Sequence, residues 1–148
     1  MIYYQKRMMP RAKGYFVRAL RVNRHDIMAM ELLGNILLVD EKKPEDARQL
    51  FANIVAELPT YPDGHYYMGS SLFDLNRFSE SVPYLQRATE LDPKGLTMGF
   101  EAASLLGDVL VKENRTAEAI EAYERALKIR PESQYIATRL KQARGEQV

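Results

Sequence analysis

Residues 114–131 read NRTAEAIEAYERALKIRP, and this stretch decides the fold of the chain. Ala119, Tyr123 and Ala126 recur at three- and four-residue steps, which is the spacing of one face of an α-helix. Pro131 then ends the helix, because proline lacks the N–H that the next backbone hydrogen bond needs. The same pattern recurs three more times upstream, so we interpret the chain as an array of one repeated helical unit.

Composition restricts the functions that this chain can have. Its 148 residues suffice for a sizeable core, and a formal net charge of +1 offers no broad field to attract nucleic acid or an anionic membrane. The absence of cysteine excludes disulfides, thiolate chemistry and Cys-based metal sites. No apolar run approaches the roughly 18 residues of a membrane span, and the first residues lack the apolar core of a signal peptide. We therefore expect a soluble protein, cytoplasmic rather than periplasmic, that neither inserts into membranes nor binds nucleic acid.

Apolar residues recur with helical period along the chain, and no segment alternates with period two, which predicts an all-α fold. The predicted helices span residues 10–22, 27–39, 44–57, 62–75, 79–91, 98–112, 116–129 and 134–143. Asp26 and Ser133 are suited to cap the helices that follow them, and Asn76 suits a turn with left-handed backbone. Pro10 and Pro83 are expected in first helical turns, where a missing N–H is tolerated.

Three helix pairs align on one another. Leu33-Gly34, Met68-Gly69 and Leu106-Gly107 lie in the first helices, Phe51, Leu85 and Tyr123 in the second, and Pro59, Pro93 and Pro131 close the units. The glycine, and a small residue in the second helix, let two backbones approach while the bulky residue fills the space beside them. This pattern resembles the tetratricopeptide repeat, a helix pair of about 34 residues. The resemblance implies a right-handed superhelical array of antiparallel helix pairs, an α-α solenoid, that binds other proteins.

The resemblance divides the chain into units. We expect a partial repeat at 1–26, repeats at 27–61, 62–95 and 96–133, and a C-terminal capping helix at 134–148. The first complete repeat has one extra residue, which we place in the turn Asp40–Pro44. About four extra residues near Lys94–Gly99 are expected to lengthen a connection or a helix start.

The N-terminus is out of phase with a complete array. Ala12, Phe16 and Ala19 match the second helix of a repeat, and only Tyr3–Met8 remain for its first helix. The end of a solenoid needs a polar cap, which the C-terminal helix resembles and this helix does not. We therefore expect the N-terminal helix to contact another domain or another copy of the chain, the latter being self-association.

In the repeat architecture the first helices line a concave face, which in this family usually binds peptides. The residues expected on that face are Glu31, Asn35, Leu38, Asp63, Tyr66, Tyr67, Ser70, Phe73, Asp74, Glu101, Ser104 and Asp108. They combine aromatic rings with acids, so we hypothesise a groove for an extended or helical segment with apolar anchors and Lys or Arg. The alternative is that the aromatics pack against neighbouring helices and the acids are only solvated.

No set of residues for chemistry accompanies this face. His25 and His65 lack the spacing of metal ligands, the serines have no paired base, and no glycine-rich phosphate loop exists. We therefore expect no metal, no cofactor and no catalytic activity. Co-chaperones of the family grip a C-terminal carboxylate with Lys, Asn and Arg. Asn35 matches one of these residues, but an acidic groove would repel a carboxylate.

The sequence thus predicts a protein-interaction scaffold that binds a peptide or helix of a partner protein. The alternative is a regulatory or docking domain of a larger enzyme, or of an assembly or secretion machine.

Overall fold

The computed structural model describes the backbone of residues 2–148 and the side chains of residues 10–148. Its helices are α1 (Ile2–Val22), α2 (Ile27–Asn35), the π-helical turn η1 (Ile36–Asp40), α3 (Pro44–Glu57), α4 (Pro62–Asp74), α5 (Phe78–Leu91), α6 (Gly99–Lys112), α7 (Thr116–Ile129) and α8 (Gln134–Ala143). The described residues contain no strand, so the predicted all-α class is confirmed. None of these helices combines the length and the apolar composition that a membrane crossing requires.

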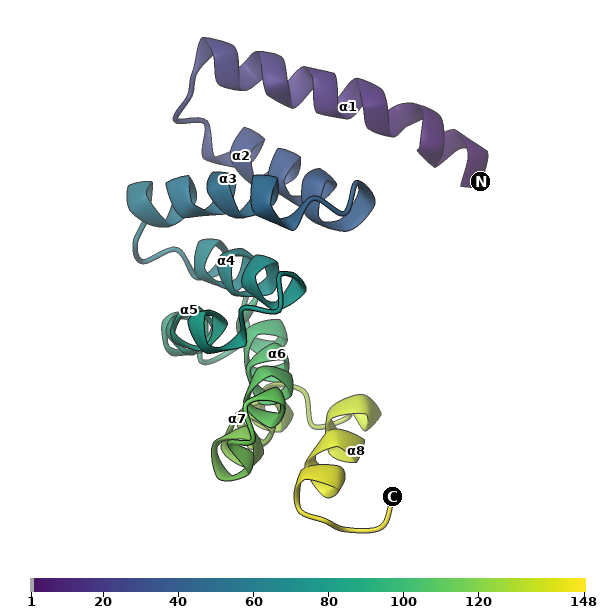
Figure 1. Cartoon of the computed structure of the whole chain (residues 1–148), viewed down its shortest axis with the longest axis vertical. Coiled ribbons are helices and arrows are strands. Elements are labelled where there is room, and N and C mark those ends of the chain that lie inside the picture. The colour runs from purple at the N-terminus through teal and green to yellow at the C-terminus, as the bar shows by residue number, and fades with distance from the viewer. Residues whose placement is uncertain (1) are drawn as a thin grey trace.

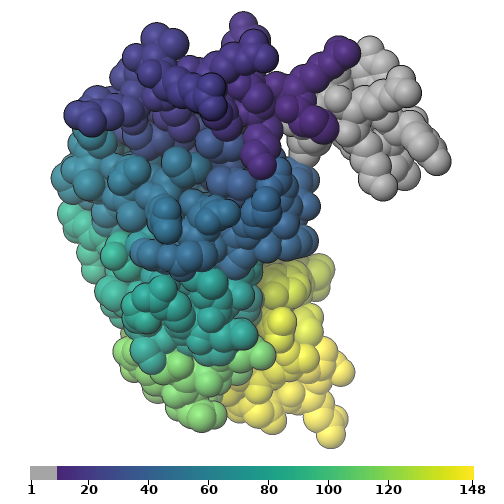
Figure 2. All heavy atoms as spheres, turned by 45° about the horizontal axis from the view of Figure 1, so that its top comes forward, coloured from purple at the N-terminus to yellow at the C-terminus, as the bar shows by residue number. Residues whose placement is uncertain are grey.

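The helices stack in antiparallel pairs (Figure 1). α2 with η1 pairs with α3, α4 pairs with α5, and α6 pairs with α7, while α8 packs on α7 and α1 packs on α2. We call α2, α4 and α6 the first helices and α3, α5 and α7 the second helices. Figure 2 shows α1 at one edge of the stack and the C-terminal residues near the other. This is the predicted right-handed superhelical array, with α8 as its C-terminal cap.

One kind of contact closes every complete pair. The glycine of the first helix lies so near the bulky residue of the second that an added Cβ would overlap it. The distances from that Cβ are 2.5 Å for Gly34–Phe51, 2.6 Å for Gly69–Leu85 and 2.3 Å for Gly107–Tyr123. The three bulky residues are 0–1% exposed. The predicted pairing of a glycine with a bulky residue is therefore confirmed in each repeat.

Both predicted caps form, but two helix starts were wrong. The side chain of Asp26 accepts from the Ala29 N–H at 3.0 Å, and that of Ser133 caps α8. α1 begins at Ile2, so Pro10 lies inside it, and the stretch expected to form a separate first helix continues α1. α5 begins at Phe78, which places Pro83 beyond the first turn. Each proline therefore removes a hydrogen bond from a helix interior.

The extra residue of the first complete repeat lies in a helix, not in the turn Asp40–Pro44. In the other two repeats a left-handed residue follows the glycine by seven positions: Gly69 precedes Asn76, and Gly107 precedes Asn114. In the first repeat the left-handed residue is Lys42, with a φ of 55°, and it follows Gly34 by eight. The Glu41 N–H donates to the Ile36 carbonyl at 3.0 Å, a five-residue step that defines a π-helix. The π-helical turn therefore absorbs the extra residue.

The second insertion forms the loop between α5 and α6. The carboxylate of Asp92, which is 5% exposed, accepts from the backbone N–H groups of Leu96, Thr97 and Gly99, each at 2.8 Å. Burial alone would raise the pKa of Asp92, but these hydrogen bonds favour the carboxylate and bring the pKa below its ordinary value. The added residues thus lengthen a connection that one buried acid organises.

Candidate functional site

Two adjacent tyrosines of α4 form the centre of the first-helix face. The ring centroids of Tyr66 and Tyr67 are 5.3 Å apart, and Tyr67 also stacks on Phe51 of α3 at 5.1 Å. Tyr66 packs against the core cluster that contains Tyr123, whereas Tyr67 packs against the cluster that contains Phe51. Both tyrosines are only half-buried. They therefore join the two cores and leave part of each ring at the surface.

Two acids from neighbouring repeats meet beside Tyr67. The Tyr61 hydroxyl donates to Glu31 Oε2 at 2.9 Å and lies 3.3 Å from Asp63 Oδ2, so it links α2 to the start of α4. Burial raises the pKa of Glu31; the Tyr61 hydrogen bond opposes this shift and the Asp63 charge adds to it. Asp63 Oδ1 is buried and has no hydrogen-bond partner among the described residues. A cation placed beside these acids would favour the charged form of Glu31 and give Asp63 Oδ1 a partner.

Acids of α4 and α6 surround Tyr66. Burial raises the pKa of Tyr66 to about 12, and the charges of Glu101 and Asp74 contribute to the shift. Desolvation likewise raises the pKa of Asp74, with Lys42 opposing it. Glu101 Oε1 pairs with Arg130 at 3.1 Å, while its Oε2 is buried without a partner in the described part of the chain. These charges and rings come from three consecutive first helices.

We call this set the acid–aromatic surface. Its members are Glu31, Asp63, Tyr66, Tyr67, Asp74 and Glu101. Carboxylates beside aromatic faces suit a Lys or Arg side chain, which ion-pairs with the acid and stacks its stem or guanidinium on the ring. The described residues hold no group of three or more His, Asp or Glu that could bind a metal ion.

Other residues expected on this face have structural contacts instead. Leu38 is 4% exposed and belongs to the core, so it offers no surface to a ligand. Asp108 accepts from the Tyr123 hydroxyl at 2.6 Å and the Tyr135 hydroxyl at 3.1 Å, with Arg139 at 3.7 Å. Burial raises the pKa of Tyr123, and its hydrogen bond to Asp108 adds to the shift. Asp108 thus ties α6 to α7 and to the capping helix.

The remaining predicted residues lie at the edges of the face. The Phe73 ring packs against Phe78 with centroids 5.5 Å apart, which fits the alternative that this aromatic is structural. The Ser104 hydroxyl donates to the Phe100 carbonyl of its own helix at 2.7 Å. Asn35 and Ser70 are also half-buried. The structure therefore brings both tyrosines and four of the acids together and assigns Phe73 mainly to packing.

Sequence reasoning missed two residues that organise the acids. Tyr61 directly precedes α4, and its position next to Pro62 at a helix start was the available signal. Arg130 follows α7, and its guanidinium carbon lies 4.1 Å from the centroid of the Phe100 ring while it pairs with Glu101. Nothing in the period of α7 predicts that contact, since Arg130 lies outside the helix.

Comparisons with known proteins agree on one architecture. The family model described as tetratricopeptide repeat matches residues 2–62 and 66–133. The crystal structure of MamA is similar with a TM-score of 0.85 and 23% identity, over 96% of this chain and 80% of that one. YrrB, described as a TPR protein with an unusual peptide-binding site, gives 0.78 and 22% over 97% and 72%. The first TPR domain of human RPAP3 gives 0.73 and 20% over 82% and 91%. None of the curated proteins matches the chain.

Proposed function

This chain belongs to the tetratricopeptide repeat family, and on that premise we propose that it is a non-catalytic scaffold that binds a segment of another protein along its first helices. The family is typically a protein-interaction repeat. The observation that carries the proposal is the acid–aromatic surface, where carboxylates from three repeats, ranging from buried Asp63 to exposed Asp74, surround two partly exposed tyrosine rings. Binding, rather than a reaction, is what such a surface can perform.

The chemistry of this surface selects the ligand class. The raised pKa values of Glu31 and Asp74 mean that each carboxylate lacks a strong counter-ion, so a cationic side chain would stabilise the charged form. Buried oxygens of Asp63 and Glu101 without partners among the described residues are further acceptors for a guanidinium. The ligand is therefore an extended or helical segment with Lys or Arg beside apolar anchors. An interface with a short peptide is small, so we expect an affinity on the order of micromolar.

A pull-down from the source cell tests this proposal with charge-neutral variants that keep side-chain shape. We expect a partner with a basic segment to be captured by the wild type and lost by Glu31→Gln/Asp74→Asn. The matched control is Glu121→Gln/Glu132→Gln, which removes two exposed charges from α7 and the turn after it and should retain the partner. A partner retained equally by both double variants would place the interface on another face.

A regulatory or docking domain of a larger assembly is the second candidate function. The observation that favours it is the incompletely covered face of α1, where Tyr15 is 76% exposed. A gene that encodes catalytic motifs next to these repeats would support this role over that of a separate scaffold.

A further inference from the structure

α1 occupies the place of a second helix, and within the described residues no first helix pairs with it as α2, α4 and α6 pair with their second helices. The positions that the second helices bury are Ala47, Phe51 and Ile54 in α3, Ser81, Leu85 and Ala88 in α5, and Ala119, Tyr123 and Ala126 in α7, all 0–1% exposed. The matching residues of α1 are Ala12, Phe16 and Ala19, and each is only half-buried. Tyr15 is 76% exposed, whereas its counterparts Leu50 in α3 and Tyr84 in α5 are half-buried and Ala122 in α7 is 3% exposed. The face that a first helix covers in three repeats is therefore open in α1.

The open face is a continuous apolar strip. Ala12, Tyr15, Ala19 and Val22 follow one another at steps of three and four residues, so they lie in line along the helix. Val22 is 91% exposed. From Ala12 to Val22 the strip runs for about 15 Å at 1.5 Å per residue, or nearly three helical turns. We call these four residues the α1 strip.

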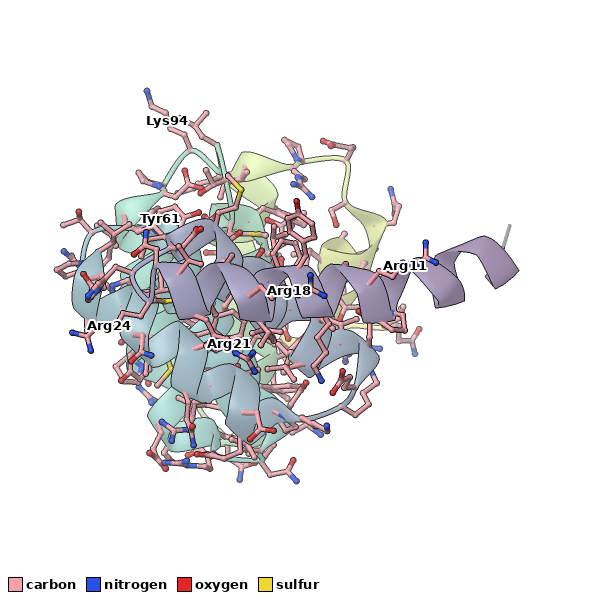
Figure 3. The ribbon with its side chains drawn as sticks, turned by 90° about the horizontal axis from the view of Figure 1, so that it is seen from above. Arg11, Arg18, Arg21, Arg24, Tyr61 and Lys94 are labelled. Atoms are coloured by element: carbon pink, nitrogen blue, oxygen red, sulfur yellow. The ribbon has the colours of Figure 1, made fainter. Side chains whose placement is uncertain are left out.

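Positive charge borders the α1 strip. Arg11 and Arg18 lie two turns apart on the helix surface next to it, and Figure 3 shows them with Arg21 along α1, seen from above. α1 contains no Asp or Glu. Lys13 pairs with Glu41 at 2.6 Å, but none of the three arginines forms an ion pair within the described residues. An occupant of the α1 strip therefore meets unneutralised cations along its outer edge.

We propose that the α1 strip binds an acidic amphipathic helix of a partner protein, which takes the position that a first helix has in the complete repeats. Such a helix needs a small residue opposite Phe16, since a glycine lies against the equivalent bulky residue in every complete repeat. It also needs acidic residues about two turns apart to face Arg11 and Arg18. This surface lies on α1 and is separate from the acid–aromatic surface, so the chain would bind partners of opposite charge at two places.

Charge favours a different protein over a second copy. A second copy could lend only a terminal helix, because α2, α4 and α6 are built into their own repeats. Both terminal helices, α1 and α8, carry Lys and Arg and no Asp or Glu. Docking either of them on the α1 strip would bring like charges together, which is unfavourable. Self-association through α1 is therefore the competing outcome of the test.

The test uses the chain's own first-helix sequence as a probe. A fluorescent peptide of residues 99–112, GFEAASLLGDVLVK, with Lys112→Glu carries three acids, of which Glu101 and Asp108 lie seven residues apart, and a glycine between these two. Its binding to the full chain is followed by fluorescence anisotropy at low salt. We expect saturable binding that is about tenfold weaker in Arg11→Glu/Arg18→Glu, from the loss and reversal of two exposed ion pairs. A peptide with Glu101→Lys/Asp108→Lys should not bind.

Matched variants separate this inference from its alternatives. Tyr15→Ser alters only an exposed side chain of the α1 strip and should weaken the peptide, whereas Arg125→Glu/Lys128→Glu on α7 should not. Equal binding to all variants, or no binding to the wild type, would overturn the proposal. A dimer in native mass spectrometry that Tyr15→Ser dissociates would overturn it in favour of a second copy. Glu31→Gln/Asp74→Asn should leave peptide affinity unchanged, so failure of the acid–aromatic surface is detected independently.

Discussion

Lys42 holds a backbone conformation that suits asparagine better. Its φ of 55° matches those of Asn76 and Asn114, at 57° and 59°, in the equivalent turns. Left-handed backbone costs an ordinary residue roughly 1–2 kcal/mol, and asparagine adopts it more readily because its side chain hydrogen-bonds locally. The strain therefore comes from having lysine at this position, because the same backbone conformation suits the asparagines of the other two turns.

Exchange of these residues measures the strain. Lys42→Asn should raise the free energy of unfolding by about 1 kcal/mol, and Asn76→Lys should lower it by a similar amount. Urea denaturation followed by circular dichroism gives both values. Unchanged midpoints for the two variants would show that the turns tolerate either residue.

At the scale of one helix, Pro83 interrupts the backbone hydrogen bonds of α5. It lies on the exposed side of α5, where the absence of its N–H removes one backbone hydrogen bond. The equivalent position of α7 is Glu121, in a helix without an interior proline. α5 is therefore held by its neighbours α4 and α6 more than by its own propensity.

Replacing this proline should stabilise the chain. Pro83→Glu is expected to raise the free energy of unfolding by up to about 3 kcal/mol, the usual difference between proline and other residues in a helix interior. Thermal unfolding provides the measurement. The reverse exchange, Glu121→Pro, should destabilise by at least as much; an increase in stability there would contradict the explanation.

The loop between α5 and α6 depends on one carboxylate. The pKa of Asp92 is lowered in the folded chain, so its contribution is complete above the ordinary value of 3.8 and is lost as pH falls through the folded pKa. Asp92→Asn should therefore lower the free energy of unfolding at neutral pH by about 1.5–3 kcal/mol, the range for hydrogen bonds to a charged group.

Denaturation at a series of pH values checks this linkage. The difference between wild type and Asp92→Asn should be constant at neutral pH and shrink as the pH falls below 3.8 and through the folded pKa. Glu132→Gln, an exposed acid outside the loop, is the control and should show no such dependence. A pH-independent difference would assign the effect to packing and not to charge.

The helices were predictable from the sequence because amphipathic period and proline positions are local signals. Leu38 is a residue whose position this reasoning predicted wrongly. An uninterrupted α-helix places it on the first-helix face, but the π-helical turn adds one residue per turn and carries both Leu37 and Leu38 into the core. Asp108 was located on the correct helix, but its partner Tyr135 comes from α8, a contact between elements that no period encodes.

At the scale of the molecule, the stack is close to one-dimensional. α1 packs on α2, whereas each complete pair has packed neighbours on both sides. In such arrays stability is roughly a sum of repeat and interface terms, so an end unit with one interface opens first. Because the residues of α1 that face the stack are only half-buried, we expect α1 to be the least stable helix of the stack.

Hydrogen exchange should reveal this gradient. Amides of α1 are expected to exchange fastest among the helices and those of α6 slowest. Leu20→Ala, which trims a residue packed on the core cluster that contains Phe51, should accelerate exchange in α1 and leave α6 unchanged. Uniform acceleration along the whole chain would show that the stack unfolds as one cooperative unit.

The π-helical turn at Ile36–Asp40 also matters for tracing homologous positions between the repeats. A one-codon insertion within a helix would ordinarily rotate all downstream side chains by about 100°. Here the wide turn restores the phase, so Lys42 and Phe51 align again with their counterparts. An alignment that places the gap in the following turn pairs residues 36–41 with residues of the other repeats that are one position out of register. A consensus repeat built from it would exchange interior and exterior positions over that stretch.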